Sequence, residues 1–398
     1  MQIIHTEKFS DTSILIRTLF PLSKELVTRL NLLVYMMRAK TKKFDTKQKL
    51  SMALSSTYGM HVSYGISGYG KQVAFDVRFK YIREDYIQKD EYLAKVIEIM
   101  KEVLYEAILD DSTLKEAKYL LKSKLKNQQD DPDAMAIRNA LVHAQKDHEI
   151  GIQVQGYLED VDFISLDEMQ QIYQTYQAQR KCVYACGHVC QEMENFLRLI
   201  PEQERLMNDF SLIHSQHTVY TLDRWDISQS SLVQVYATNT AMDDELYYPL
   251  LVMNSMLGQC PMNLLFEEIR EKKSYCYSIS SNLIRFDGAL VIMAGTNCKN
   301  IDDVQCLIDV QIDRLVQGDV DEDLISIAKS DIVDMIQAQQ DQASSMMEQR
   351  FLDRLLKRTS TNEDRISQIE QVTMEQVQKV ASRLSLVSVS IVEEKDEI

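Results

Sequence analysis

Two hydrophobic periods alternate along this chain. Runs of β-branched and apolar residues, or of residues that alternate between apolar and polar, predict the strands of the first half, at 13–20, 60–66, 72–79 and 181–187. Gly65, Gly68 and Gly70 separate the middle two runs, which is typical of a β-hairpin. Apolar residues at helical spacing predict helices at 23–37, 46–55, 91–109, 112–127, 133–148 and 165–179.

The same order of elements recurs in the second half. Strands are predicted at 231–237, 276–280, 288–294 and 386–392, and helices at 243–257, 263–272, 301–316, from 322 onward and at 373–381. Residues 164–173 correspond to residues 372–381, an offset of roughly 210 positions. We therefore expect an α+β fold of two homologous domains, each a mostly antiparallel sheet with helices packed on one face. The predicted domains are residues 1–200 and 216–398, joined by a polar, acidic linker at 201–215.

Composition narrows the class of protein. With 398 residues, of which 45% are hydrophobic and 26% charged, the chain can bury sizeable cores. A net charge of -16 argues against nucleic acid, because binding phosphates needs clustered Lys and Arg. No apolar run is long enough to span a membrane, and the first residues lack the pattern of a secretion signal. The seven cysteines, an odd number scattered through the chain, suggest reduced thiols, so we expect a cytoplasmic protein.

One stretch carries recognisable chemistry, residues 266–278, with Arg270 and, seven positions later, Tyr277. Together with Gly258 and the Leu265-Phe266 pair that precede it, this stretch resembles the signature of the pitrilysin (insulinase, mitochondrial processing peptidase) family. The resemblance covers nearly the whole chain and is closest to the smaller bacterial members that work as pairs. It implies that Arg270 would bind the substrate backbone and that the Tyr277 hydroxyl would assist the oxyanion of the tetrahedral intermediate. Ser274 and Tyr275 depart from the Gly-Leu that is usual there.

The same family carries its zinc on an HxxEH helix, and this motif is absent from the sequence. The resemblance places the motif on residues 31–35, where Asn31 and Tyr35 replace the two His ligands and Val34 replaces the general-base Glu. The third ligand would fall near residues 121–124, which include no carboxylate. Zinc needs His, Cys or carboxylate ligands, and its water needs a base. We therefore expect no metal or other cofactor in this chain and no hydrolytic activity of the chain alone.

The resemblance implies the non-catalytic subunit of a heterodimeric zinc peptidase. A homologous partner would bring HxxEH and the zinc, this chain would contribute Arg270 and Tyr277, and the two would close around an unfolded peptide. The isolated chain could form a homodimer. Two alternatives stay open: a catalytically silent scaffold or peptide-binding protein of the same fold, in which Arg270 and Tyr277 are relics, and a self-sufficient peptidase with an unrecognised site.

Three further groups invite a functional interpretation. Cysteines 182, 186 and 190, with His188, could bind a metal, but along a strand they form a line longer than a tetrahedral site, which favours buried thiols. His143 and His148 are five residues apart, which places their rings about 140° apart on a helix and disfavours a shared metal. His61 and Tyr64 lie in the hairpin where the family binds peptide by edge pairing, although a hairpin without a special role is the alternative.

Overall fold

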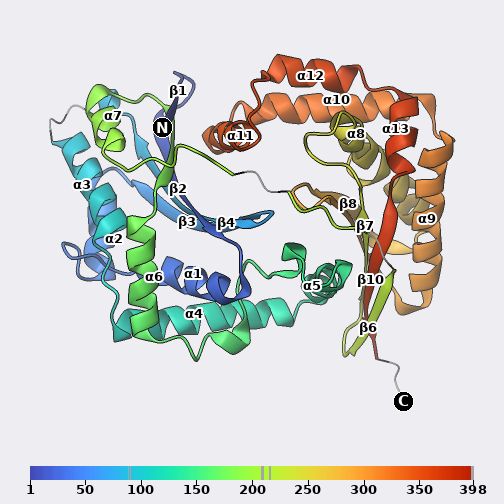
Figure 1. Ribbon diagram of the computed structural model, residues 1–398, viewed down its shortest axis with the longest axis horizontal. Coiled ribbons are helices and arrows are strands. Elements are labelled where there is room, and N and C mark those ends of the chain that lie inside the picture. Colours follow the sequence, from blue (N-terminus) through green and yellow to red (C-terminus); the bar gives the residue numbers. More distant parts are fainter. Residues whose placement is uncertain (88, 90, 208–209, 215–216, 396–398) are drawn as a thin grey trace. The chain divides into compact units, whose positions relative to one another are not determined.

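The computed structural model describes residues 1–398 except 88, 90, 208–209, 215–216 and 396–398 (Figure 1). The chain forms two compact units, and each is discontinuous in sequence. Unit 1 comprises residues 1–126, 153–208 and 339–358, and unit 2 comprises residues 127–152, 209–338 and 359–398. The predicted linker at 201–215 falls partly outside the described residues.

Unit 1 is built on a five-stranded sheet with the order β1-β5-β2-β4-β3. Its strands are β1 (Gln2–His5), β2 (Asp11–Pro21), β3 (His61–Tyr69), β4 (Gln72–Ile82) and β5 (Lys181–Gly187). β1 pairs parallel with β5, and the other pairings are antiparallel. The two-residue turn between β3 and β4 places Gly70 at φ 58°, a left-handed conformation that glycine adopts without steric cost.

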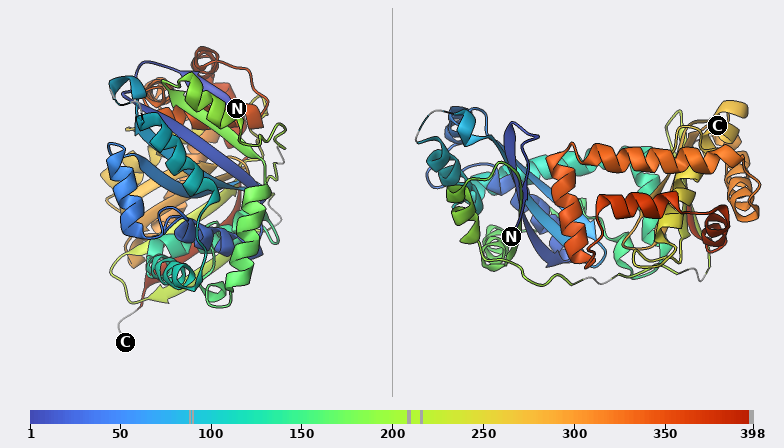
Figure 2. Two further views of the ribbon diagram at one scale, coloured as in Figure 1. Left: turned by 90° about the vertical axis from the view of Figure 1, so that its left-hand side faces the viewer. Right: turned by 90° about the horizontal axis from the view of Figure 1, so that it is seen from above.

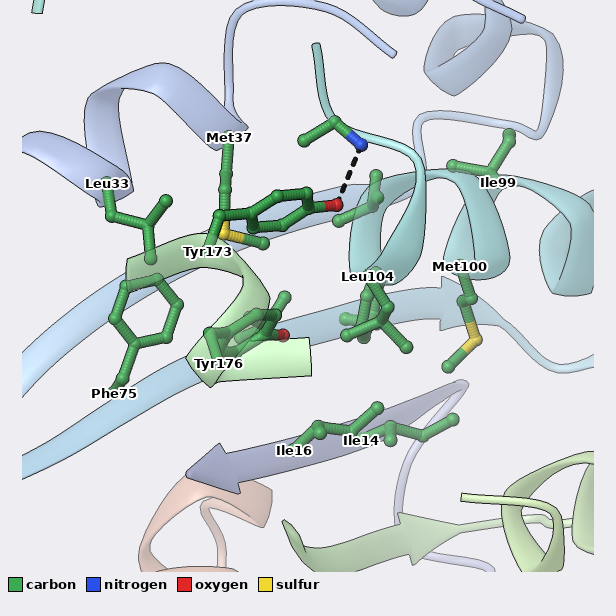
Figure 3. Close-up of a cluster of buried hydrophobic side chains, with 14 of the residues drawn as sticks. Ile14, Ile16, Leu33, Met37, Phe75, Ile99, Met100, Leu104, Tyr173 and Tyr176 are labelled. Atoms are coloured by element: carbon green, nitrogen blue, oxygen red, sulfur yellow. Dashed lines mark hydrogen bonds between the residues drawn. The ribbon is translucent and has the colours of Figure 1, made fainter. Parts of the chain in front are cut away.

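The core of unit 1 lies between one face of this sheet and a layer of helices (Figure 3). Alternate residues of β2 and β4, among them Ile14, Ile16 and Phe75, point into the layer. Tyr173 and Tyr176 pack on them from helix α6 (Leu166–Ala178), and the Tyr173 hydroxyl accepts a hydrogen bond from the backbone N–H of Ala107, 3.0 Å away. Fully burying one such side chain stabilises a fold by about 1.5–3 kcal/mol, so this layer holds the unit together. The helices of unit 1 in the first half of the chain are α1 (Lys24–Met37), α2 (Lys47–Ser56), η1 (Glu84–Tyr86), α3 (Tyr92–Tyr105), α4 (Asp111–Gln129, whose last turn enters unit 2), η3 (Leu158–Asp160), α6 (Leu166–Ala178) and α7 (Gln191–Arg198).

Unit 2 repeats this topology. Its sheet has the order β6-β10-β7-β9-β8, which is the order of unit 1 with every strand number raised by five. The strands are β6 (Val219–Trp225), β7 (Ser230–Ala237), β8 (Cys276–Ile284), β9 (Ala289–Thr296) and β10 (Ser385–Glu394). The pairing of β6 with β10 is parallel and the others are antiparallel. The predicted α+β fold with two mostly antiparallel, helix-covered sheets is thereby confirmed.

The helices of unit 2 cover one face of its sheet with a second apolar core. They are α8 (Tyr247–Gly258), η4 (Phe266–Lys272), η5 (Cys298–Asn300), α9 (Ile301–Gln317), α10 (Glu322–Gln339), α12 (Asn362–Glu370) and α13 (Met374–Ala381). Thr373 caps α13 with a reciprocal capping box to Gln376, as Ser165 caps α6 with Glu168, so the predicted internal correspondence extends to the helix caps. Within the described part of the chain, none of the helices combines the length and apolarity needed to cross a bilayer.

Each sheet also receives a helix on its other face, from the opposite half of the sequence. Helix α5 (Pro132–Ala144), followed by η2 (Glu149–Gly151), packs on β7 and β10 of unit 2 through Ala136, Ala140 and Ala144. The Ser388 hydroxyl donates a 2.7 Å hydrogen bond to the carbonyl of Ala140. The small alanine side chains allow the backbone of α5 to approach the sheet this closely. Helix α11 (Ala343–Leu355) packs on β1, β2 and β5 of unit 1 (Figure 2). The sequence pattern predicted α5 as a helix but not which sheet it covers, because helical periodicity shows an apolar face and not its partner.

Three local differences from the sequence prediction have physical reasons. The edge strands β1 and β6 were not predicted, because β1 has four residues and β6 is Val-Tyr-Thr-Leu-Asp-Arg-Trp, in which exposed and half-buried positions alternate. The predicted helix at 133–148 ends at Ala144. The predicted helix at 263–272 is π-helical from Phe266 to Lys272.

Candidate functional site

The positions that would hold zinc lie on α1 and are filled by structural contacts. Asn31 is 6% exposed, and its side-chain amide donates hydrogen bonds to the carbonyls of Val27, at 2.9 Å, and Val154, at 2.8 Å. Val34 and Tyr35 are half-buried and pack against the core. The guanidinium of Arg38 lies 5.9 Å from the centre of the Tyr35 ring. The side-chain nitrogen of Asn31 is therefore used as a hydrogen-bond donor within α1 and to the segment that contains Val154.

That segment, residues 153–160, lies directly against α1. The backbone N–H of Tyr157 donates to the hydroxyl of Thr28 at 3.0 Å. A Cβ placed on Gly156, whose φ is 94°, would lie 3.0 Å from the Cα of Thr28, so the two backbones are in close contact. Val154 in turn lies 3.2 Å from the position of a Cβ on Gly68 in β3. The segment thus fills the space between α1 and β3.

The region of the third ligand also lacks metal chemistry. Leu121 on α4 is fully buried in the core of unit 1. Across the described residues, no three His, Cys, Asp or Glu side chains are placed to hold a metal ion. Asn31, Val34 and Tyr35, like Leu121, therefore serve packing and hydrogen bonding at the positions where the sequence resemblance predicts zinc ligands and the general base.

The signature stretch begins with a well-anchored helix end. The Asn263 side chain donates to the carbonyl of Cys260 at 2.7 Å and accepts from the backbone N–H of Phe266 at 2.9 Å, which caps the following turn. The π-helical winding from Phe266 places Arg270 over the Phe266 ring, with 4.8 Å between the guanidinium and the ring centre. Such windings occur often at functional sites, since each widened turn re-aims the side chains that follow. The stack on Phe266 restricts the guanidinium of Arg270, while 45% of the side chain stays exposed.

The turn after the π-helix uses a serine where the family usually has glycine. Ser274 has φ 55°, in the left-handed region, and its N–H donates to the carbonyl of Arg270 at 3.0 Å. Tyr275 donates its N–H to the carbonyl of Ile269 at 3.0 Å, and its own carbonyl accepts hydrogen bonds from Thr296 and Asn300. The turn that leads into β8 therefore forms despite the replacement of Gly-Leu by Ser-Tyr.

Tyr277 lies on β8, the edge strand of the unit 2 sheet, where the pairing with β9 is irregular between Cys276 and Ser278. Its side chain is 55% exposed, and its hydroxyl donates a 3.0 Å hydrogen bond to the side-chain oxygen of Asn297. Arg270 is 45% exposed, and the nearest carboxylate oxygen, on Glu271, is 4.0 Å from its Nε. Burial raises the pKa of the Cys276 thiol to about 11, while the charge of Arg270 acts in the opposite direction, so Arg270 lies near the start of β8.

Gly258, which also matches the signature, has a packing role. A Cβ at this position would lie 2.5 Å from the Ser281 hydroxyl and 2.7 Å from the Ser281 backbone nitrogen. The end of α8 therefore passes against β8 at a distance that admits glycine alone. The Ser281 hydroxyl also donates to the side-chain oxygen of Asn254 at 2.7 Å, which fixes α8 beneath the strand that carries Tyr277.

The other candidates occupy separate places. Cys182 and Cys186 are buried on β5, and Cys190 is the N-cap residue of α7. His143 contacts the carbonyl of Asn139 within its own helix, at 2.8 Å. His148 is buried; its Nδ1 accepts from the N–H of Ile150 and its Nε2 lies 2.8 Å from the carbonyl of Ser211. These residues have packing and capping contacts, and the structure does not bring them together as metal ligands.

The two hairpin residues differ from each other. His61 is exposed at the start of β3, the edge strand of unit 1. Tyr64 points toward the helices, its hydroxyl donates to the carbonyl of Met37 at 3.3 Å, and burial raises its pKa.

A buried ionic cluster in unit 1 was missed from the sequence. Arg17 on β2 is fully buried and binds both Asp76 on β4 and Glu348 on α11. Burial alone would lower the pKa of Arg17, but the hydrogen bonds and charges of Asp76 and Glu348 outweigh it and raise this pKa. The sequence did contain a signal, since Arg17 and Asp76 each interrupt an apolar strand pattern. Charged residues are rarely buried without a partner, so these two could have been predicted to pair.

Comparison with known proteins agrees with this description. Residues 164–332 match the family model of the peptidase M16 inactive domain. The probable inactive metalloprotease YmfF of Bacillus subtilis is 25% identical over 397 residues, which cover 96% of this chain and 93% of YmfF. A conserved protein from Enterococcus faecalis V583 has a similar structure, with a TM-score of 0.92 and 25% identity over 100% of this chain and 96% of that chain. The peptidase M16 inactive domain structure from Pseudomonas fluorescens, at 13% identity, shares the fold with a TM-score of 0.80 over 99% of this chain and 95% of that chain.

These similarities confirm the resemblance that residues 258–278 predicted, since M16 is the pitrilysin and insulinase family. The similarity to YmfF covers 96% of this chain. The chain therefore resembles the inactive members of the peptidase M16 family, and it carries Asn31, Val34 and Tyr35 where this resemblance predicts the zinc ligands and the general base.

Proposed function

We propose that this chain is the non-catalytic subunit of a two-chain zinc peptidase and that it presents Arg270 and Tyr277 to a peptide bound at the zinc of an HxxEH-bearing partner. The observation that carries the proposal is the contrast between the two units. The zinc positions of unit 1 are occupied by structural hydrogen bonds, whereas the two signature side chains of unit 2 are half-exposed. The elements that carry these two side chains in unit 2 are also well packed: Asn263 caps the turn before Arg270, and Gly258 lets α8 lie against β8.

The exposed groups suit the roles proposed for them. An arginine is charged at any working pH and presents a fixed fork of N–H donors, which can bind backbone carbonyls of an extended peptide. Phe266 stacks on the guanidinium of Arg270 and restricts this side chain, so less side-chain entropy is lost when the fork binds. The Tyr277 hydroxyl is a donor within reach of solvent, and it would exchange the Asn297 oxygen for the oxyanion that forms at the partner's zinc. The peptide would be unfolded, because both groups lie beside the edge strand β8 and recognise backbone.

The experiment is co-expression with an HxxEH-bearing M16 homologue and measurement of cleavage of a quenched fluorescent peptide. Arg270→Ala and Tyr277→Phe should each lower kcat/KM by at least about tenfold, since the removal of one transition-state donor costs on the order of 100- to 1,000-fold in kcat. Arg285→Ala and Tyr220→Phe are matched controls, because both residues are exposed in unit 2 away from the signature. Zinc should be found with the partner. Full activity in both signature variants would favour the scaffold alternative, and one zinc bound per isolated copy of this chain would overturn the proposal.

A further inference from the structure

A pocket of about 350 Å³ lies in unit 1, on the face of the sheet opposite α1 and α6, which we call the outer face. It lies where the first residues of β3 and the end of β4 meet the first turn of α11. Its volume is near the lower end of the range of roughly 300 to 1,000 Å³ that small-ligand sites occupy. Its lining belongs to unit 1 alone, and Arg270 and Tyr277 take no part in it.

Strand register places polar donors around this pocket. His61 pairs with Lys80, and Ser63 pairs with Arg78, so the four side chains project from the outer face of two neighbouring strands. Ser13 on β2 lies opposite Lys80 on the other side and completes the row. Imidazole, hydroxyl, ammonium and guanidinium groups are all able to donate hydrogen bonds, which makes the pocket rich in donors.

The two carboxylates that line the pocket are already paired. Asp11 accepts from Lys80 at 3.0 Å, and Asp341 accepts from Lys8 at 2.9 Å. Arg78 donates to Asp76 at 2.6 Å, but Asp76 is itself held by Arg17, so one carboxylate is shared between two guanidinium groups. The side chains of His61 and Ser63 make no hydrogen bond to another described residue. The pocket therefore offers hydrogen-bond donors to a further carboxylate.

The site is built around Arg78 and the start of α11. A Cβ on Gly65 would lie 3.0 Å from a terminal nitrogen of Arg78, so the absence of a side chain at Gly65 makes room for the guanidinium on the sheet surface. Gln342, the N-cap of α11, makes no side-chain capping hydrogen bond, and Ser344 in the first turn lines the pocket. The positive end of this helix adds to the preference for an anion. Phe9 and Met347 supply an apolar wall.

We propose that this pocket binds the C-terminal residue of an extended peptide. The terminal carboxylate accepts hydrogen bonds from Arg78, Lys80 and Ser63, and the side chain of the last residue packs on Phe9 and Met347. β3 is an edge strand, so the backbone of the peptide finds free N–H and C=O groups beside the pocket. The apolar wall favours the side chain of an amino-acid residue over inorganic phosphate, which has no apolar part to pack on Phe9 and Met347. The proposal is independent of the role of Arg270 and Tyr277.

The test uses the full chain and a fluorescein-labelled peptide of about ten residues that ends in leucine, made with a free C-terminal carboxylate and as the C-terminal amide. Fluorescence anisotropy should show that the free acid binds at least about tenfold more tightly, because the amide lacks the negative charge that strengthens hydrogen bonds from Arg78 and Lys80. Lys80→Gln should remove most of this difference, and Lys80→Arg should retain it. Lys49→Gln is the matched control, since Lys49 on α2 and Lys80 are both 58% exposed.

Three results would overturn the proposal. The first is equal affinity of the acid and the amide, and the second is a difference that Lys80→Gln leaves unchanged. The third is displacement of the peptide by inorganic phosphate more effectively than by the unlabelled free acid, which would assign the pocket to a phosphate ligand. Because Lys80 is largely exposed, its replacement does not endanger folding. Arg78→Gln is a second variant, in the next cross-strand pair of β3 and β4. It should also reduce the difference between acid and amide, and thermal unfolding checks that it is folded.

Discussion

Arg17 on β2 donates two hydrogen bonds to the carboxylate of Asp76 on β4, from Nε at 2.7 Å and from a terminal nitrogen at 2.8 Å, and both side chains are fully buried. The same guanidinium reaches Glu348 on α11 at 2.8 Å and stacks 4.1 Å from the centre of the Phe351 ring. Tyr69 adds a 2.6 Å hydrogen bond to Glu348. The pair therefore joins two strands of the first half of the chain to a helix from the second half.

This pairing leads to the first prediction. Arg17→Met should destabilise the protein by about 3–5 kcal/mol, because it leaves the Asp76 carboxylate buried with Arg78 as its remaining partner. Arg17→Met combined with Asp76→Leu should cost less than Arg17→Met alone, since no fully buried charge then lacks its partner. Glu348 and Arg78, which lose theirs, are 31% and 36% exposed. Urea unfolding followed by circular dichroism measures both. The control is Arg198→Met, at an arginine that is 62% exposed, and a loss as large as that of Arg17→Met in this control would contradict the explanation.

The sequence predicted the elements of this structure better than their tertiary partners. Strands such as β2 and β4 are evident because their alternate residues are apolar, and α6 is evident because Ser165 begins a capping box. The contact of Arg17 with Glu348 joins positions 331 residues apart, and no local periodicity carries such information. The exchange of α5 and α11 between the units has the same cause. An apolar helix face of alanines shows that α5 is buried but does not show on which sheet.

The candidate site divides in a similar way. The absence of zinc ligands at Asn31, Val34 and Tyr35 follows from side-chain chemistry and could be predicted. That Asn31 binds the carbonyl of Val154 could not be predicted, since it depends on where the segment 153–160 lies. The turn at Ser274 is an intermediate case. The family usually has a glycine there, which suits a left-handed residue, and Ser274 adopts that conformation in this structure.

The second prediction concerns this turn. Ser274→Gly should stabilise unit 2 by up to about 1 kcal/mol, because a left-handed conformation costs a residue with a Cβ roughly 1–2 kcal/mol and glycine loses part of this gain through its larger unfolded-state entropy. Thermal unfolding measures the change. Gly258→Ala is the opposite case: its Cβ would lie 2.7 Å from a backbone nitrogen of β8, and overpacking of this kind costs about 1–3 kcal/mol. Equal effects of the two substitutions would contradict the roles assigned to these residues.

The third prediction is that introducing HxxEH at residues 31–35 does not create a zinc site. In the triple variant Asn31→His, Val34→Glu, Tyr35→His, we expect far less than one zinc per chain after dialysis, measured by atomic absorption. The third-ligand region holds the buried Leu121, and the segment 153–160 lies against α1. Asn31→Ala alone should make this segment more sensitive to limited proteolysis, since it loses the hydrogen bond to Val154. Stoichiometric zinc in the triple variant would show that the site is still open.

The fourth prediction is a pH dependence of stability that arises at Asp287. Burial, with a smaller effect of Glu149, raises the pKa of this carboxyl to about 7, and its Oδ1 lies 3.9 Å from Nδ1 of His148. Between the ordinary pKa of aspartate, about 3.9, and pH 7, the folded protein holds a proton at Asp287 that the unfolded chain has released. The contribution of this group to stability is therefore complete below about pH 4, declines as the pH rises to about 7, and is constant above that.

Asp287→Asn tests this contribution, because asparagine keeps the shape and removes the titration. Each unit of pKa shift corresponds to about 1.4 kcal/mol, so a shift of this size corresponds to a few kcal/mol. The variant should gain stability relative to the wild type as the pH rises from 4 to 7, and the difference should then stay constant up to pH 8. The measurement is the midpoint of urea unfolding at pH 4, 5, 6, 7 and 8, with Asp303→Asn, an exposed aspartate on α9, as the control. A difference between Asp287→Asn and wild type that is the same at every pH would show that folding does not raise the pKa of Asp287.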